Sequence, residues 1–412
     1  MESRCDVLIV GGGLVGSSLA CALDGLALDV VQLEAEPPRG GEARWDERHF
    51  ALARRTVEAL SAIGAWPAIA PEAQAIRRVE VSSRGDFGVV RIAAADYGLE
   101  SLGSTAPARA VAQGLARRVE ACQRLQRVAP ARVVALDAGA DAIEVEYERE
   151  GRRARIRARL LVGADGTASF VRGALGIGAS THDYGQTAIA AAAEIDGAAA
   201  GVARERFTPD GPLALLPLSR GRAGLVWTVA SSAVERVLAL DDVACLAEIQ
   251  ALLGHGAGHL RRIGRRQPWP LALTRADALT APRAVLVGNA AQTLHPIGAQ
   301  GFNLGLRDAM ALAREIAAAL RDGTDPGAPA LLAAYAAARA SDRARTIEWT
   351  DGLVRGFAHR GAPLRFARGL AMAALERWPD AKRELAWRLM GYPADASARS
   401  LRDARPVIGP VG

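Results

Sequence analysis

Lysine is almost absent from this chain, and features that mark several common protein classes are missing as well. Lys382 is the only lysine, so the net charge of +6 comes from arginines, which are spread along the sequence rather than clustered with aromatic residues. This distribution argues against a nucleic-acid-binding protein. Two interpretations of the arginine excess stay open, a compositional bias and attraction to an anionic membrane surface.

Metal motifs, disulfide motifs and membrane-spanning runs are also missing. The 4 cysteines lack C-x-x-C spacing, so we expect reduced thiols and no zinc site. His255 and His259 are four residues apart, but the glycines around them break the helix that would align them, so no metal site is predicted. No apolar run approaches the ~20 residues needed to cross a bilayer. Because residues 6–10 already read as a strand, no signal peptide is predicted and we expect a cytoplasmic protein.

The length and composition indicate an ordinary globular protein. The 412 residues suit two or three domains, and a composition that is 50% apolar and 23% charged can bury a core large enough to enclose a cofactor.

The N-terminus carries a dinucleotide-binding fingerprint. An apolar strand at residues 6–10 leads into Gly11-Gly12-Gly13-Leu14-Val15-Gly16, a helix of small residues, and a second strand that ends at Glu34. Gly11 permits the tight turn, Gly13 lets the backbone approach a pyrophosphate, and Gly16 lets helix and strand pack closely. Glu34 is placed to accept hydrogen bonds from an adenine ribose. A glycine-rich turn without a ligand is the alternative, and the fingerprint by itself does not separate FAD from NAD.

A second glycine-rich segment runs from Val285 to Asp308. A short strand at residues 284–287 ends at Gly288, a loop follows, and a helix is predicted to begin near Asn303 and to continue through Leu320. The glycines at positions 298, 301 and 305 open space for a ligand, and the helix start favours an anion. A reduced flavin carries negative charge at one edge of its ring, so it fits this description.

This segment carries a family resemblance. Gly-Asn-Ala-Ala-Gln-Thr-Leu-His-Pro at 288–296, followed by Gln-Gly-Phe-Asn-Leu-Gly at 300–305 and by Arg-Asp at 307–308, resembles the flavin-ring segment of class A FAD-dependent aromatic monooxygenases. It is most similar to the ubiquinone-biosynthesis hydroxylases, in particular the 2-polyprenyl-6-methoxyphenol 4-hydroxylase branch, which also has Asn at position 289. The order Gly298-Ala299 departs from the Ala-Gly of that branch, and it strains the loop if the second position needs a positive φ. A strand–helix loop in an unrelated α/β protein is the alternative.

The resemblance implies three further flavin contacts. Arg48 matches an arginine that contacts the flavin in the family, although a surface arginine before a helix is equally open. Gln113 matches a flavin contact better than Arg109 does. Asp165 and Gly166 resemble the family's Asp-Gly motif for FAD and the visiting nicotinamide, with a plain Asx-turn as the alternative for Asp165.

The fold that the resemblance implies is α/β. It combines a Rossmann-like FAD-binding domain of the p-hydroxybenzoate-hydroxylase type with an inserted mixed β-sheet substrate domain and C-terminal helices. The predicted boundaries are 1–70, 106–180 and 280–325 for the FAD-binding domain, 71–105 and 181–279 for the substrate domain, 326–391 for the helices, and a disordered tail at 392–412. Helices are expected at about 331–357, 364–378 and 381–390, and strands and turns over residues 183–270. Residues 132–136 and 143–148 are predicted to form a hairpin with its turn at Glu150-Gly151.

The activity that the resemblance implies is hydroxylation of a polyprenylated phenol in ubiquinone biosynthesis, with 2-polyprenyl-6-methoxyphenol as substrate and position 4 as target. In the family, NADH or NADPH reduces FAD, O2 adds at the flavin C4a carbon, and the phenol ring attacks the resulting hydroperoxide. The alternatives are another ring position, a small soluble phenol, a non-oxygenating flavoprotein reductase, and a non-catalytic FAD-stabilised subunit. A complex with other enzymes of the pathway, a homo-oligomer and peripheral contact with the inner face of the membrane stay open.

The candidate site residues follow from these motifs. The catalytic candidates are the backbone around Pro296 and a positioning role for His295, and no base for the phenol can be named. The predicted cofactor contacts are Gly11, Gly13, Leu14, Val15, Gly16, Glu34, Arg48, Gln113, Asp165, Gly166, Gly288, Asn289, Pro296, Gly298, Gln300, Gly301, Phe302 and Asn303.

Overall fold

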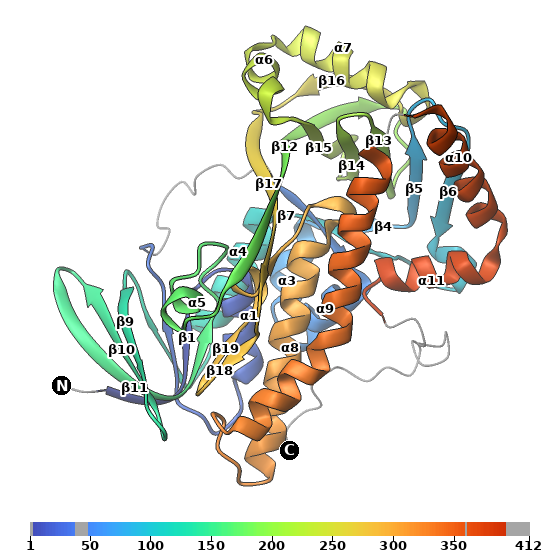
Figure 1. Ribbon diagram of the computed structural model, residues 1–412. Coiled ribbons are helices and arrows are strands. Elements are labelled where there is room, and N and C mark those ends of the chain that lie inside the picture. The colour runs from blue at the N-terminus through green and yellow to red at the C-terminus, as the bar shows by residue number, and fades with distance from the viewer. Residues whose placement is uncertain (1–2, 38–47, 359–360, 393–412) are drawn as a thin grey trace.

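A largely parallel sheet forms the centre of the region that contains the glycine fingerprint at residues 11–16. The structure is a computed structural model, described for residues 3–37, 48–358 and 361–392, so the tail predicted to be disordered lies outside it from residue 393. The strand order is β18-β19-β11-β1-β2-β8, with β10 and β9 continuing beside β11 (Figure 1). Its strands are β1 (Ser3–Val10), β2 (Val30–Leu33), β8 (Leu125–Val128), β9 (Arg132–Ala138), β10 (Ile143–Arg149), β11 (Arg152–Gly163), β18 (Thr280–Ala281) and β19 (Ala284–Leu286).

The register of this sheet brings the ends of its central strands together. Val10 at the end of β1 lies opposite both Leu33 of β2 and Gly163 of β11, and Gly163 lies opposite Leu286 of β19. Because these strands are parallel, their carboxyl ends meet at one edge, where ligands bind in open α/β sheets. The strands are continuous apolar runs because both faces of the sheet are covered.

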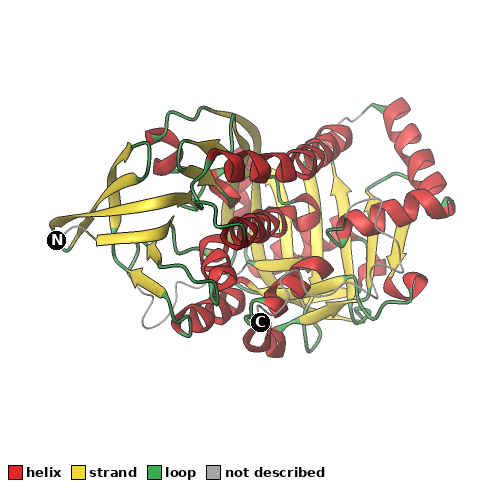
Figure 2. Cartoon of the chain, turned by 90° about the horizontal axis from the view of Figure 1, so that it is seen from below, coloured by secondary structure: helices red, strands yellow, loops and turns green. Residues whose placement is uncertain are grey.

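Helices pack on this sheet and on one another. Helix α1 packs against α4 and α8, and α8 packs against α9. Figure 2 shows the helices in red beside the yellow strands of the sheets. The helices and one-turn segments of this region are α1 (Leu14–Leu23), α2 (Arg54–Ala62), α3 (Trp66–Ile69), η1 (Ala70–Glu72), α4 (Ala108–Glu120), α5 (Phe170–Ala174), η5 (Gly288–Ala290), η6 (Ile297–Ala299), α8 (Gln300–Arg321) and α9 (Pro329–Ala358). Helix α8 begins three residues before the predicted start near Asn303, so the glycine at position 301 lies in its first turn rather than in the loop.

A second sheet of nine strands lies beside the first, in the order β20-β17-β12-β15-β14-β13-β5-β6, with β16 beside β12. Its strands are β5 (Arg78–Ser83), β6 (Val89–Ala93), β12 (Ala179–Asp196), β13 (Val202–Thr208), β14 (Gly211–Pro217), β15 (Arg222–Ala230), β16 (His259–Ile263), β17 (Gln267–Ala276) and β20 (Gln292–Thr293). A three-stranded sheet of β3 (His49–Ala53), β7 (Gly103–Pro107) and β4 (Gln74–Ile76) joins the two regions.

Two details of the sequence interpretation are wrong here. Residues 183–270 were expected to hold only strands and turns, but η3 (Ser231–Ala233), α6 (Val234–Ala239) and α7 (Asp242–Leu253) cover one face of the nine-stranded sheet, with η4 (His255–Ala257) following. The turn at Glu150–Gly151 joins β10 to β11, whereas residues 139–142 join β9 to β10.

The C-terminal helices follow the predicted order. The short segment η2 (Ala94–Tyr97) follows β6 in the chain. Helices α10 (Ala362–Arg377) and α11 (Pro379–Leu389) pack near β6, where Trp387 and Met390 form a small core with Val90 and Ile92. The domain boundaries stay a prediction, because the 18-residue strand β12 begins at Ala179 beside the first region and runs into the second.

Candidate functional site

The glycine fingerprint forms the tight turn that its spacing predicts. Gly11 has φ +111°, and a side chain there would collide with the Ala164 carbonyl. A side chain at Gly16 would collide with the Gly11 carbonyl, whereas one at Gly13 would meet no atom within 4 Å. Helix α1 starts after Gly13 without a side-chain cap, so its first N–H groups are available to an anion.

Glu34 lies directly beside this turn. Its Oε2 accepts a hydrogen bond from the Gly12 N–H at 2.6 Å and its Oε1 accepts one from the Glu36 N–H at 2.8 Å. Each carboxylate oxygen has a further lone pair, so Glu34 can still accept a hydrogen bond from a ribose hydroxyl.

The Asp165 carboxylate orders the chain that follows it, and its role as a cofactor contact stays a prediction. Its carboxylate accepts hydrogen bonds from Ser169 Oγ at 2.5 Å and from the Val171 N–H at 3.0 Å, which fixes the start of α5. Arg172 then donates to the carbonyls of Ala290 (2.9 Å) and Thr167 (3.0 Å), tying this motif to the flavin-type segment.

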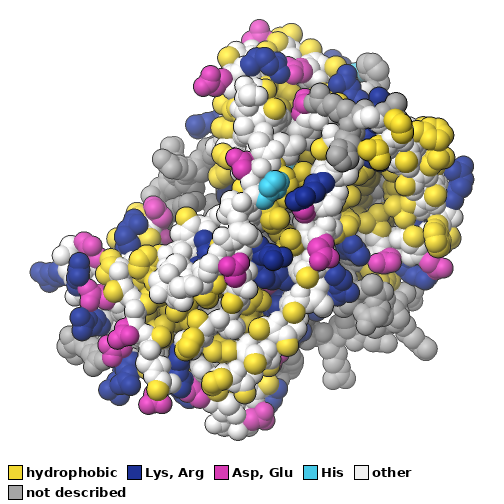
Figure 3. All heavy atoms as spheres, viewed as in Figure 1, with side chains coloured by type: hydrophobic (Ala, Val, Ile, Leu, Met, Phe, Trp, Pro, Cys, Tyr) yellow, Lys and Arg dark blue, Asp and Glu magenta, His cyan; other side chains and the backbone are white. Residues whose placement is uncertain are grey.

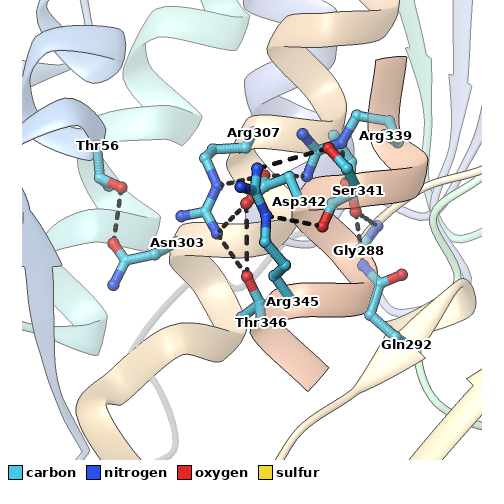
Figure 4. Close-up of polar contacts among 11 residues, drawn as sticks. Thr56, Gly288, Gln292, Asn303, Arg307, Arg339, Ser341, Asp342, Arg345 and Thr346 are labelled. Atoms are coloured by element: carbon cyan, nitrogen blue, oxygen red, sulfur yellow. Dashed lines mark hydrogen bonds and ion pairs between the residues drawn. The ribbon is translucent and has the colours of Figure 1, made fainter. Parts of the chain in front are cut away.

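A buried ion pair anchors the segment from Gly288 onward. Asp308 on α8 accepts hydrogen bonds from the Gly288 N–H at 3.2 Å and from Gln292 Nε2 at 2.7 Å, and Arg339 Nε on α9 donates to its other oxygen at 2.7 Å. Asp342 then links Arg339 to Arg307, as Figure 4 shows. These arginines hold the pKa of Asp342 down at about 2 against the opposing effect of burial. Charged groups of two helices therefore fix the loop that approaches the ligand.

The Asn303 side chain forms hydrogen bonds that hold three elements together. Its Oδ1 accepts hydrogen bonds from the Ala53 N–H at 3.0 Å and from Thr56 Oγ1 at 2.7 Å, and its Nδ2 donates to the carbonyls of Ala51 (3.0 Å) and Ala299 (2.7 Å); Figure 4 includes the contact with Thr56. All four hydrogen-bonding positions of the amide are used. The side chain therefore joins β3 and α2 to α8, which leaves only the Asn303 main chain for a cofactor.

The unusual Gly298-Ala299 order is accommodated with strain. Gly298 has φ +61° and Ala299 has φ +52°, so both positions are left-handed. Such a conformation costs an alanine roughly 1–2 kcal/mol. The space at Gly298 is also limited, because an added Cβ would lie 3.1 Å from the Trp349 ring. The predicted strain is therefore present and falls on Ala299, at the start of α8.

His295 is buried and uncharged. Its Nδ1 accepts a hydrogen bond from the Ile297 N–H at 3.3 Å and its Nε2 lies 3.2 Å from Gln186 Oε1, so both ring nitrogens are occupied. Burial lowers the pKa of His295 to about 4. These contacts suit the positioning role rather than that of a base.

Two predicted contacts lie outside the glycine-rich segments. The Arg48 guanidinium stacks on Trp269, 4.2 Å from the ring centroid, and Gln113 is on α4. Arg109, the weaker candidate, forms an ion pair with Glu72.

These elements enclose a cavity of about 1080 Å³. Most of the predicted cofactor contacts line it: Gly13, Leu14, Val15, Glu34, Arg48, Gln113, Gly166, Asn289, Pro296, Gly298, Gly301, Phe302 and Asn303. The other five are not among its lining residues: Gly11, Gly16, Asp165, Gly288 and Gln300. His295, the positioning candidate, is not among them either. Gln300 is buried, and its Nε2 donates to the Gly298 carbonyl at 3.1 Å.

The cavity fits FAD. The starts of α1 and α8 both face it and neither has a side-chain cap, so it offers one site for a pyrophosphate and another for the charged edge of a reduced ring. Within the described ranges, no group of three or more His, Cys, Asp and Glu side chains is arranged to hold a metal ion.

Sequence reasoning missed a carboxylate in the cavity wall. Glu205 on β13 lines the cavity, and the Gly298 N–H donates to its Oε1 at 3.5 Å. Burial raises its pKa to about 7, partly offset by the Gly298 N–H. The available signal was the alternation Ala203, Glu205, Phe207, which places a carboxylate among the inward positions of a strand.

Comparison with known families defines the class of protein. The model of the FAD-binding domain family matches residues 4–350, and the chain belongs to this family. The family resemblance carried by the glycine motifs is thereby confirmed.

Individual relatives cover almost the whole chain. A ubiquinone hydroxylase of Rhodospirillum rubrum is 40% identical over 95% of this chain and 90% of its own length. The 3-demethoxyubiquinol 3-hydroxylase of Escherichia coli is 31% identical, with coverage of 92% and 96%. Among solved structures, the p-nitrophenol 4-monooxygenase of Pseudomonas putida has a TM-score of 0.77 at 19% identity, with 95% of this chain and 99% of that chain covered. This similarity confirms the predicted α/β fold of the p-hydroxybenzoate-hydroxylase type.

Proposed function

We propose that this FAD-dependent aromatic monooxygenase hydroxylates a polyprenylated phenol in ubiquinone biosynthesis, at position 4 of 2-polyprenyl-6-methoxyphenol. One observation carries the proposal: the two uncapped helix starts and the apolar face of a nine-stranded sheet line the same cavity. The names of the two relatives above support the ubiquinone pathway. FAD and O2, with NADH or NADPH as reductant, are the cofactor and cosubstrates.

The cavity wall suits a substrate with a prenyl chain. Its part on the nine-stranded sheet is formed largely by small and apolar side chains, which include Ala188, Ala190, Ala214, Val226 and Leu271. Burial of each prenyl methylene group there contributes about 0.8 kcal/mol to binding. The small side chains leave room for the ring beside the flavin.

The chain contributes placement and dryness to the reaction. Reduced FAD, when bound, supplies the means to activate O2. The N–H groups at the start of α8 would stabilise negative charge on the flavin, and the Gly298-to-Phe302 backbone would position its ring. Glu34 would hold the ribose and the α1 start the pyrophosphate, with Arg48 and Gln113 as further contacts of the cofactor.

We also propose peripheral contact with the cytoplasmic face of an anionic membrane, from which a prenylated substrate must be taken. Leu364, Phe366, Leu370 and Trp378 are exposed on or beside α10, and Figure 3 shows hydrophobic side chains gathered where Figure 1 places this helix. The exposed Arg377 lies beside them and favours anionic headgroups. None of the helices in the described ranges combines the length and apolar character that crossing a bilayer requires.

Vesicle sedimentation tests the membrane contact. Phe366→Ser with Leu370→Ser should reduce binding to anionic vesicles, whereas Val243→Ser on α7, which is equally apolar and 79% exposed, should not. Equal binding by both variants contradicts this part of the proposal.

Turnover under 18O2 tests the reaction. The purified protein is incubated with FAD, NADPH or NADH and 2-polyprenyl-6-methoxyphenol, and the product is analysed by mass spectrometry. One 18O atom at position 4 supports the proposal. Label at another ring position, label only in small phenols, or NAD(P)H oxidation without label overturns it in favour of the corresponding alternative.

A further inference from the structure

Glu205 belongs to a row of side chains that crosses the nine-stranded sheet on its cavity face. In the sheet register it lies opposite Ala214 on β14, which lies opposite Val226 on β15, which lies opposite Ala190 on β12. Ala190, Ala214 and Val226 also line the cavity. Glu205 is thus the carboxylate at one end of the cavity-lining part of this row, and the row continues beyond the cavity to Val81 on β5 and to Gln267 on β17.

The neighbours of Glu205 along β13 place it beside the loop that contains Ile297 and Gly298, within the segment that resembles the flavin-ring segment of the family. Phe207, two residues on and therefore on the same face, packs against Ile297. Gly298, the next residue of the loop, donates its N–H to Glu205 at 3.5 Å. The carboxylate therefore lies where the apolar wall meets the loop expected to hold the flavin ring.

Ionisable groups on the surrounding elements are engaged with one another. Arg204, adjacent on β13 and also among the residues that line the cavity, pairs with Glu80 at 3.0 Å, and Asp351 on α9 accepts from Tyr184 at 2.9 Å. His295 in the loop is neutral in the physiological range, because burial lowers its pKa. Within the described residues, no ion pair to Glu205 is found, and its pKa is governed by burial and by the Gly298 N–H alone.

The other acids of the cavity differ in position. Glu34, Glu36 and Glu120 lie after β2 or on α4, at the parallel sheet, so Glu205 is the cavity-lining acid of the nine-stranded sheet among the described residues. Of the arginines that line the cavity, Arg48 is stacked on Trp269 and Arg204 is paired with Glu80.

We propose that Glu205 is the base that accepts the proton of the substrate's ring hydroxyl, a role that rests on the proposed aromatic hydroxylation. The phenol O–H bond breaks, an O–H bond forms on the Glu205 carboxylate, and the electron pair stays on the ring oxygen. No electrons leave the substrate in this step. The resulting phenolate is richer in electrons at the position para to its oxygen, which is the position that must attack activated oxygen.

The acidity of Glu205 suits this exchange. A carboxyl group whose pKa is raised to about 7 is half ionised near neutral pH, so it can take up and release a proton during each turnover. The Gly298 N–H keeps the carboxylate directed toward the loop, because it can donate only from that side.

Glu205→Gln is the decisive variant, with Glu205→Asp as the conservative one. Glu80→Gln is the control, because Glu80 is a carboxylate on the adjacent strand β5 that faces the other side of the sheet. FAD content and the rate of flavin reduction by NAD(P)H are measured first, and all three variants should match the wild type. Product formation is then followed between pH 5.5 and 9.5.

Wild type and Glu80→Gln should gain activity as pH rises to about 7 and then level off. Glu205→Gln should lose about 100-fold at pH 7, a typical contribution of one base, and recover as pH approaches ~10, where a free phenol ionises. Glu205→Asp should recover part of the rate. An unchanged rate and pH profile for Glu205→Gln overturns the role of Glu205.

A second measurement does not depend on the variants folding well. Difference absorption of the phenol bound to the oxidised wild-type enzyme reports phenolate directly. Phenolate formation near pH 7 supports the proposal, and formation only near ~10 contradicts it. If the wild type forms phenolate but gives no oxygenated product, the proposed hydroxylation is contradicted and the role of Glu205 as a base is not. If the wild type hydroxylates the phenol but neither the phenolate nor the predicted pH profile is found, only the role of Glu205 is contradicted.

Discussion

Asp308 on α8 and Arg339 on α9 form a buried ion pair, with 2.7 Å between Oδ1 and Nε and only 3% and 6% of the two side chains exposed. The same carboxylate holds the Gly288 N–H and Gln292, so one charge connects the helix packing to the position of the ligand-binding loop. Stability and cofactor binding should therefore respond together when the pair is broken.

Asp308→Asn tests this connection. The substitution leaves Arg339 with Asp342 as its remaining counter-ion and should lower the free energy of unfolding by about 3 kcal/mol, the low end for breaking a buried pair, with weaker FAD binding. Urea unfolding and FAD titration measure the two effects. The control Glu248→Gln breaks the exposed pair with Arg236 and should cost less than about 1 kcal/mol. Equal effects of the two variants contradict the anchoring role of Asp308.

Ala299→Gly should stabilise the protein. Ala299 has φ +52°, and glycine adopts this conformation without steric cost, so a gain of about 1 kcal/mol in unfolding free energy is expected. The same substitution at Ala337, an exposed interior position of α9, should destabilise by about 1 kcal/mol. Thermal unfolding of both variants decides the matter, and a loss of stability in Ala299→Gly refutes the strain at this position.

Gly13→Ala should weaken FAD binding without weakening the apoprotein. An added methyl group at Gly13 meets no protein atom within 4 Å but enters the path of the pyrophosphate, so the Kd for FAD should rise at least tenfold, or about 1.4 kcal/mol. Gly173→Ala on α5 is the control, because its added methyl group is equally unopposed. Normal FAD affinity in Gly13→Ala, or a large drop in apoprotein stability, contradicts the assignment.

His295 should make the fold sensitive to mild acid. Burial lowers its pKa from 6.5 to about 4, so the unfolded chain binds the proton first; the stability contribution is complete above pH 6.5 and is lost as pH falls toward 4. The loss amounts to about 3 kcal/mol at most. His295→Asn should flatten the dependence of unfolding free energy on pH in this window. A variant that lacks the exposed His182 imidazole serves as the control. If the unfolding free energy of His295→Asn depends on pH as steeply as that of the wild type, the prediction is wrong.

The local motifs of the fold could be predicted from the sequence. The turn at Gly11 and the close packing at Gly16 follow from steric rules that act within a few residues, and the C-terminal helices follow from apolar periodicity. No bounds were predicted for the long strand β12, because its alanine-rich stretch has few of the β-branched residues that mark strands. Helices α6 and α7 were not predicted, because the strand patterns of the segments around them led to an assignment of strands and turns for the whole region.

Site chemistry that depends on distant partners was out of reach. The motif that contains Asp165 did not predict the hydrogen bonds that its carboxylate accepts from Ser169 and from the Val171 N–H. Glu205 and Gly298 are 93 positions apart, and no spacing rule connects a strand residue to a loop so far along the chain. The strain at Ala299 could be anticipated because it depends on the residue's own φ.

A crystal structure of the protein with FAD bound tests the central claim most directly, namely that one cavity holds the whole cofactor between Glu34 and the start of α8. The account predicts density for the adenine ribose beside the Glu34 carboxylate and for the flavin ring against the Gly298-to-Phe302 backbone, with Glu205 on the substrate side of the ring. Density for the ring outside this cavity, or far from Gly301, would contradict it.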